Sequence, residues 1–308
     1  MPGLIPPRPR YQRERILIGY PILLLFVLLF AVRFCEGLLP LPTDRLWFKS
    51  AVSFGVFFLP ALLFLILRGP TPPKRLRMFA PRLRHYPFLF SAFFVLISGG
   101  MLLSMLCGGT SSLGNSATSF EEIATSPISL LWAIPSLAIL PALLEELFFR
   151  GIVVTEYERR GAIRAVLMSA LLFALCHFDL RNLPVYFFSG LLFALVLLAT
   201  NSLFATVILH AVYNTASLFA QRYLNALYEF TGNLELFIFL LVVVFLVASI
   251  FFCRSAAKLY GLRAKAAIPN PRRAVPRNVQ LYTTLDALCD PPFIICLLIA
   301  IAGFILLN

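Results

Sequence analysis

The chain has 308 residues, of which 60% are hydrophobic and only 13% are charged, and its mean hydropathy is +0.89. These values exclude an ordinary soluble domain and indicate that the lipid bilayer is the main solvent of the chain. The formal net charge of +12 is typical of nucleic-acid binding in a soluble protein, but in a membrane protein it usually reflects the basic cytoplasmic loops. We therefore expect a multi-pass integral membrane protein whose partner is the bilayer, with no nucleic acid.

Apolar runs recur along the whole chain, and a helix needs roughly 20 apolar residues to cross the hydrocarbon core. The last run is the one most easily reassigned to a re-entrant or interfacial segment. The pattern predicts an all-α, polytopic transmembrane helix bundle of about eight or nine spans, forming a single membrane domain over residues 1–308. The nine candidates lie near 16–32, 51–67, 86–106, 128–149, 163–178, 183–199, 202–219, 235–253 and 293–307.

Basic residues fill alternate loops, whereas the third loop holds Glu121 and Glu122 and no base. This alternation predicts a cytoplasmic N-terminus. Residues 254–291 are predicted to form a basic cytoplasmic loop, in which Ile268 to Arg277 lies near anionic headgroups, and residues 108–119 an outer loop without regular periodicity. The compact loops suggest a bacterial cell membrane.

Ionisable residues inside the spans are few and grouped. Each costs about 2.5 to 3.5 kcal/mol on insertion scales, so an intramembrane ionisable residue is by default a functional candidate. Glu145 and Glu146 lie well inside an apolar run, and so do two of the three histidines, His177 and His210. Hydrogen bonding between helices is the alternative interpretation of a single His or Asn, but it does not require two adjacent carboxylates.

Three pairs of these residues lie four positions apart and so share a helix face. Within the first pair, Arg150 can neutralise Glu146, which leaves Glu145, rotated by about 100°, to face another neighbour or a cavity. Pro135 and Pro141 precede the acidic pair and remove helix hydrogen bonds, which either widens the helix to admit water or simply kinks it. The pairs are Glu146 with Arg150, Phe173 with His177, and His210 with Asn214.

Counting residues from the predicted turns places four polar residues at one depth. If a helix runs on to a turn at Gly161, Glu145 and His177 each stand 16 residues from that turn, which corresponds to roughly 24 Å at 1.5 Å per residue. Turns near 179–182 and 200–201 then bring the last polar pair to roughly 18 and 24 Å, nearer the outer face. The level residues are Glu145, His177, His210 and Asn214.

This set suits the hydrolysis of an amide by an activated water. Apolar surroundings make a carboxylate a better proton acceptor, so Glu145 is the candidate general base, and His177 can hold the same water or donate to the leaving amine. His210 and Asn214 can present donors to the oxyanion of a tetrahedral intermediate. No serine has the context of a nucleophile, and Cys176 is expected to project about 100° away from its neighbour His177 and to be a poor partner for it.

At these positions the sequence resembles the CPBP (Abi) intramembrane proteases, which include the type II CAAX prenyl endopeptidases. The pattern of that family is EExxxR, FxxxH and HxxxN, each on a separate transmembrane helix. The resemblance covers about residues 128–219 and implies a catalytic core of four helices. In this chain the motifs are Glu145-Glu146-Leu-Phe-Phe-Arg150, Phe173-Ala-Leu-Cys-His177 and His210-Ala-Val-Tyr-Asn214.

The resemblance implies that Glu145 and His177 activate water, and that His210 and Asn214 stabilise the oxyanion. It also implies an intramembrane endopeptidase that acts on a membrane-associated peptide or protein without a metal or other cofactor. Outside the core the chain has its own helices and loops, so a prenylated substrate does not carry over. The supporting positions are Glu146, Arg150 and Phe173.

Two other classes of function remain open at this point. The first is a zinc protease, because Glu145, His177 and His210 form a ligand set seen at catalytic zinc, although no HExxH helix is present. The second is a non-catalytic transporter or a peptide-binding or immunity protein, in which the same residues relay protons or bind a peptide. Chelator sensitivity would favour zinc, and inverted repeats would favour a transporter.

Overall fold

A computed structural model of the chain describes residues 11–43, 45–69, 75–107, 131–266 and 284–307, and all regular secondary structure in these ranges is helical. This confirms the predicted all-α class. The helices are α1 (Tyr11–Leu38), α2 (Leu46–Arg68), η1 (Leu83–His85), α3 (Tyr86–Leu106), η2 (Ile134–Ile139), α6 (Leu140–Glu146), η3 (Leu147–Val154), α7 (Thr155–Tyr157), η4 (Glu158–Arg160), α8 (Ala162–Leu175), α9 (Leu183–Thr200), α10 (Leu203–Thr231), α11 (Leu234–Ala266) and α13 (Pro291–Leu306).

Within the described residues, five helices are long and apolar enough to cross a membrane, and three shorter helices are also apolar. The protein is therefore a multi-pass integral membrane protein. These eight helices correspond to eight of the nine predicted runs. The five long candidates are Ile18–Leu38, Leu46–Arg68, Leu83–Leu106, Leu183–Thr200 and Leu234–Leu262, and the shorter helices are Ala162–Leu175, Leu203–Phe219 and Pro291–Leu306.

The ninth run, predicted near 128–149, belongs to a helix of mixed geometry that is continuous from residue 131 to residue 160. Two π-helical segments, η2 and η3, flank the α-helical segment α6, which carries Glu145 and Glu146. Pro135 lies in η2 and Pro141 at the start of α6, and neither can donate a backbone hydrogen bond. The prolines thus coincide with a widened helix, and π segments of this kind are frequent at functional sites.

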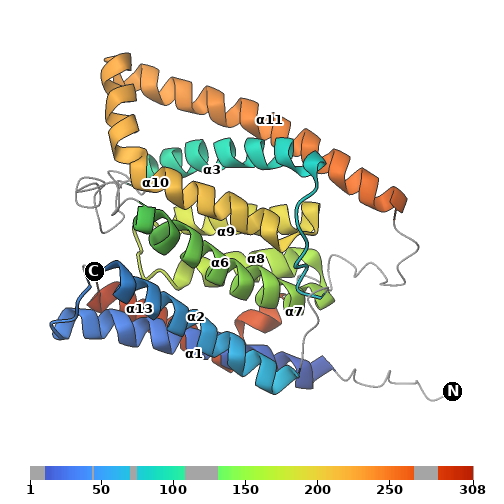
Figure 1. Cartoon of the computed structure of the whole chain (residues 1–308). Helices are drawn as coiled ribbons and strands as arrows, with labels where there is room; N and C mark the ends of the chain where they lie inside the picture. The colour runs from blue at the N-terminus through green and yellow to red at the C-terminus, as the bar shows by residue number, and fades with distance from the viewer. Residues whose placement is uncertain (1–10, 44, 70–74, 108–130, 267–283, 308) are drawn as a thin grey trace.

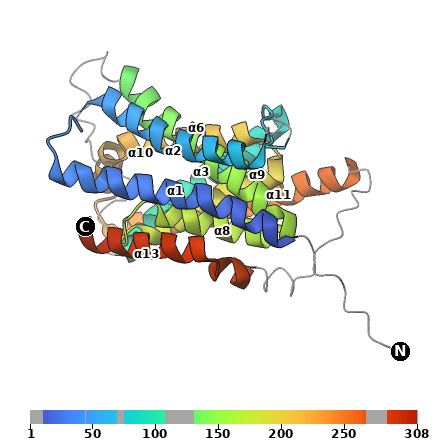
Figure 2. The same ribbon diagram turned by 90° about the horizontal axis from the view of Figure 1, so that it is seen from below.

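The helices form a stack in which the segment from residue 131 to α10 is central (Figure 1). On one side of it α9 and α10 pack against α3, which pairs with α11. On the other side α2 packs against α6, and α1 lies between α2 and α13 (Figure 2). The central helices are therefore enclosed from both sides by helices that come from the two ends of the chain.

All three predicted turns are present. Gly161 (φ 135°) separates η4 from α8, and Asn201 (φ 55°) follows α9. Between α8 and α9, the carboxylate of Asp179 accepts hydrogen bonds from the backbone N–H of Asn182 at 3.1 Å and from its side-chain amide at 2.7 Å. The turns make consecutive central helices antiparallel, as the depth count required.

Two of the predicted basic loops meet at one end of the stack. Arg68 and Arg75 donate to the carboxylate of Glu156 at 2.9 and 2.5 Å, and Arg77 pairs with Glu158. Loops that follow the second span and the fourth predicted span thus lie on the same side, as alternating sidedness requires.

Three of the predicted loop features fall outside the described residues. These are the loop 108–119, the pair Glu121 and Glu122, and the stretch from Ile268 to Arg277. The basic loop predicted over 254–291 begins later than expected, because α11 continues as helix to Ala266.

Candidate active site

The predicted pair of Glu146 and Arg150 is present and fully buried. Arg150 Nη1 donates to Glu146 Oε1 at 2.9 Å, and both side chains are 0% exposed. The second Nη of Arg150 donates to the carbonyl of Gly190 at 3.1 Å. The guanidinium carbon lies 4.5 Å from the ring centroid of Phe173 and 5.1 Å from that of Phe193. Arg150 is therefore held by α6, α8 and α9 together.

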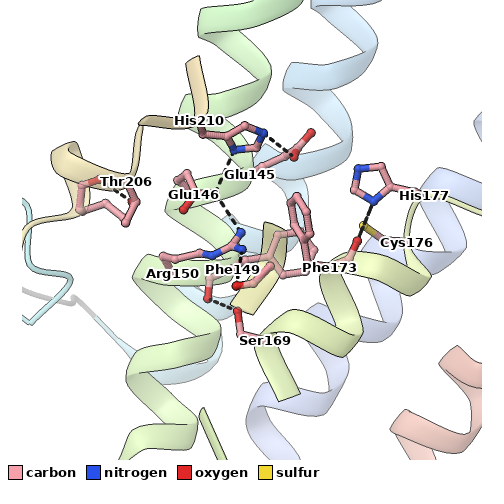
Figure 3. Close-up of polar contacts among 12 residues, drawn as sticks. Glu145, Glu146, Phe149, Arg150, Ser169, Phe173, Cys176, His177, Thr206 and His210 are labelled. Atoms are coloured by element: carbon pink, nitrogen blue, oxygen red, sulfur yellow. Dashed lines mark hydrogen bonds and ion pairs between the residues drawn. The ribbon is translucent and has the colours of Figure 1, made fainter. Parts of the chain in front are cut away.

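His210 of α10 bridges the two adjacent carboxylates (Figure 3). Its Nδ1 lies 2.9 Å from Glu146 Oε1 and its Nε2 lies 3.9 Å from Glu145 Oε2. The imidazole stacks on the ring of Phe193, with centroids 4.5 Å apart. This places the third sequence motif directly against the first.

The two glutamates have different surroundings, as their 100° separation predicts. Glu146 is surrounded by Arg150 and His210, whereas the ion pair of Glu145 within the described chain is with His210. The side chain of Glu145 is 17% exposed and that of Glu146 is 0% exposed. Glu145 is therefore the more exposed of the two carboxylates.

His177 has a fixed orientation at the end of α8. Its Nδ1 lies 2.6 Å from the carbonyl oxygen of Phe173. A carbonyl oxygen only accepts, so Nδ1 is the donor and the lone pair of the neutral ring is on Nε2. The ring stacks on Tyr186 of α9, with centroids 3.9 Å apart and planes at 16°, and it meets Phe173 edge-on at 4.9 Å.

The predicted direction of the Cys176 side chain is wrong, because it lies beside that of His177. His177 Nδ1 donates to the Phe173 carbonyl, however, so this nitrogen cannot accept the thiol proton. Cys176 Sγ lies 3.6 Å from His177 Nδ1 and 3.1 Å from the carbonyl oxygen of Phe173. The 100° rotation between consecutive residues holds only inside a helix, and α8 ends at Leu175.

Phe173 lies between the two histidines. Its ring centroid is 4.9 Å from that of His177 and 5.9 Å from that of His210, and Figure 3 shows it beside Arg150. The structure thus brings the first residue of FxxxH into contact with all three motifs, whereas its sequence position indicated only a shared face with His177.

Asn214 lies one turn beyond His210 on α10 and is partly exposed. Within the part of the chain that the structure describes, its side chain makes no hydrogen bond. Its place in the site therefore follows from the direction of α10 rather than from a contact.

A metal centre was one of the alternatives for this set of residues. Among the described residues, no three His, Cys, Asp or Glu side chains are arranged to hold an ion. In both histidines Nδ1 contacts a protein oxygen, which leaves Nε2 of each ring for other partners.

Three residues at the site escaped the sequence analysis. Phe193 and Tyr186 stack on the two histidines, and their spacing in α9 gave no sign of it. A Cβ on Gly190 would lie 2.8 Å from Cα of Ala170, so α8 and α9 approach closely there. Small residues in both helices were the available signal.

Comparison with protein families finds a match over residues 127–216 to the family described as Type II CAAX prenyl endopeptidase Rce1-like. The matched stretch contains the three motifs and ends shortly after Asn214. It does not include α1, α2, α3, α11 or α13. Comparisons with curated proteins and with solved structures found no match.

Proposed function

We propose that this chain is an intramembrane endopeptidase that hydrolyses a peptide bond with a water activated by Glu145 and His177. The proposal starts from the match of residues 127–216 to the Rce1-like type II CAAX prenyl endopeptidase (CPBP) family, which is a family of membrane proteases. The catalytic core is residues 128–219. The substrate is a membrane-associated peptide or protein, and no metal or other cofactor takes part.

The unequal surroundings of the two glutamates carry this proposal. Glu146 is occupied by Arg150 and His210, so it supports the site. Glu145 has no arginine within ion-pair distance among the described residues and keeps part of its surface open. A carboxylate in this position is free to accept a proton from water.

His177 acts on the same water from the other side of Phe173. Its Nδ1–H is committed to the Phe173 carbonyl, so Nε2 accepts a hydrogen bond from the water. The proton that Glu145 takes from the water then passes to Nε2 and from there to the nitrogen of the leaving amine as the C–N bond breaks. The stack on Tyr186 keeps the ring from rotating.

His210 and Asn214 stabilise the oxyanion that forms when water attacks the carbonyl carbon. In this role His210 donates from Nε2 and carries a proton on each nitrogen, with Glu146 accepting from Nδ1. The Asn214 amide, one turn further along α10, supplies the second donor. The His210 ring is held before the reaction begins by Glu146 and by its stack on Phe193, which is the condition for electrostatic stabilisation.

Cleavage of a peptide panel tests the proposal. The purified protein in lipid is given membrane-tethered and prenylated peptides, and wild type is compared with Glu145→Ala and His177→Ala, with and without a chelator. Glu235→Ala is the matched control, because Glu235 is exposed at the start of α11.

Cleavage that is lost in both site variants, retained in the control and insensitive to chelator supports the metal-free protease. Chelator-sensitive cleavage would favour the zinc alternative. A folded wild type that cleaves no member of the panel would contradict the protease and favour a binding or transport role.

A further inference from the structure

The backbone at Phe178, the residue directly after His177, is in the left-handed region, with φ at 51°. A non-glycine residue costs about 1 to 2 kcal/mol in this region, and glycine is the usual residue where a helix ends in this way. Asn201, at the end of α9, follows the usual preference for Gly or Asn. A phenylalanine in the same conformation indicates that packing of its ring offsets the cost of the left-handed backbone.

The ring of Phe178 is buried between the two terminal helices of the chain. It is 3% exposed and meets the rings of Phe26 and Phe30 of α1 edge-on, at centroid distances of 6.3 and 6.1 Å. On its other side is Gly303 of α13, where an added Cβ would lie 2.4 Å from Phe178 Cδ1. The ring thus occupies a notch that exists because residue 303 has no side chain.

The two helices that form this notch pack against each other along their length (Figure 2). A Cβ on Gly19 of α1 would lie 2.8 Å from Cγ of Pro292, at the start of α13. Close contact at that end and the Phe178 notch near the other end make α1 and α13 one rigid support. Neither helix belongs to the matched family domain.

We propose that α1 and α13 hold His177 in the position that the reaction needs by packing around the ring of Phe178. Phe178 is therefore a positioning residue. Helix ends fray, and α8 ends at Leu175. In the turn that follows, the N–H groups of His177 and Phe178 donate to the carbonyls of Ala174 and Leu175 at 3.3 Å each, which are long hydrogen bonds. Phe178 is the next residue in the chain, so its anchored ring also limits the movement of the His177 backbone. The expected effect on cleavage rests on the proposed function of His177. The fixing of the turn by the packing of α1 and α13 around Phe178 does not.

Two variants weaken the packing of Phe178 between α1 and α13 in different ways. Phe178→Gly removes the ring and suits the left-handed backbone, so no backbone strain is added to the loss of the ring. Gly303→Ala fills the notch and displaces the ring. Gly55→Ala in α2 is the matched control, because a Cβ there meets no atom within 4 Å.

The first readout is independent of any substrate. Cys176 is buried and adjoins His177, so its thiol reports the position of the turn once the other five cysteines have been replaced. We expect a membrane-permeant maleimide to label Cys176 about tenfold faster in Phe178→Gly and Gly303→Ala than in the parent, and equally fast in Gly55→Ala. Unchanged labelling in both variants would overturn the proposal that α1 and α13 fix this turn through Phe178.

The second readout is cleavage. A displacement of about 1 Å at a reacting group can cost about 100-fold in rate, so kcat falls by about that factor while KM is unchanged. Faster labelling with an unchanged kcat overturns the positioning role. If both variants are labelled faster but the wild type cleaves no peptide, the role of Phe178 in fixing the turn is supported. That outcome counts against the proposed function alone.

Discussion

Loss of the Arg150 side chain should be among the most damaging single changes in this protein. Arg150→Met keeps most of the volume but leaves the fully buried carboxylate of Glu146 with His210 as its remaining partner. Removing one partner of a buried ion pair costs about 3 to 5 kcal/mol. The variant also loses the hydrogen bond to the Gly190 carbonyl, so we expect the upper part of that range.

The double variant Glu146→Gln/Arg150→Met separates the charge from the packing. It leaves no unpartnered charge, and the amide oxygen of Gln can still accept from His210 Nδ1. Replacing both members of a buried pair is often close to neutral. The double variant should therefore be at least about 2 kcal/mol more stable than the sum of the two single effects predicts.

Equilibrium unfolding in detergent micelles measures these free energies. Arg84→Met is the control, because Arg84 is exposed and a surface change of this kind stays within about 0.5 kcal/mol. Additive single effects, or a cost below about 1 kcal/mol for Arg150→Met, would refute the view that this pair neutralises Glu146 in the core.

Three further predictions follow from the site. Asn214→Ala should lower kcat by about 10² to 10³-fold. It should change the unfolding free energy by less than about 0.5 kcal/mol, because the Asn214 side chain makes no hydrogen bond to another described residue. A stability loss without a rate loss would contradict this. Gly190→Ala should destabilise by about 1 to 3 kcal/mol, since its Cβ would meet the backbone of Ala170 at 2.8 Å, whereas Gly55→Ala should not destabilise. Chelation should leave cleavage unchanged, and loss that a divalent metal restores would disprove the metal-free mechanism.

The sequence predicted most of the helices and the turns between them because these depend on local rules. Apolar length, turn residues and 1.5 Å per residue are sufficient to locate the turns at Gly161 and Asn201. The four-residue spacing of Glu146 and Arg150 likewise required only helix periodicity. Eight of the nine predicted runs are apolar helices for the same reason.

Contacts between helices were not predictable in this way. The bridge from His210 to Glu146 and the stack of His177 on Tyr186 depend on how α10 and α9 rotate about their axes. That rotation is set by close packing between helices, which no single span encodes. The error over Cys176 has a local cause, because helical geometry was extended past the end of α8.

The central claim is that two adjacent glutamates have separate tasks, and one comparison tests it most directly. Cleavage and unfolding are measured in parallel for Glu145→Gln and Glu146→Gln, which are isosteric changes one residue apart. We expect Glu145→Gln to lower kcat by about 10² to 10⁴-fold, the usual contribution of a general base, with little change in stability. Glu146→Gln should lower the unfolding free energy by about 3 to 5 kcal/mol. A Glu145→Gln protein that still cleaves at the wild-type rate, or one as destabilised as Glu146→Gln, would contradict the account.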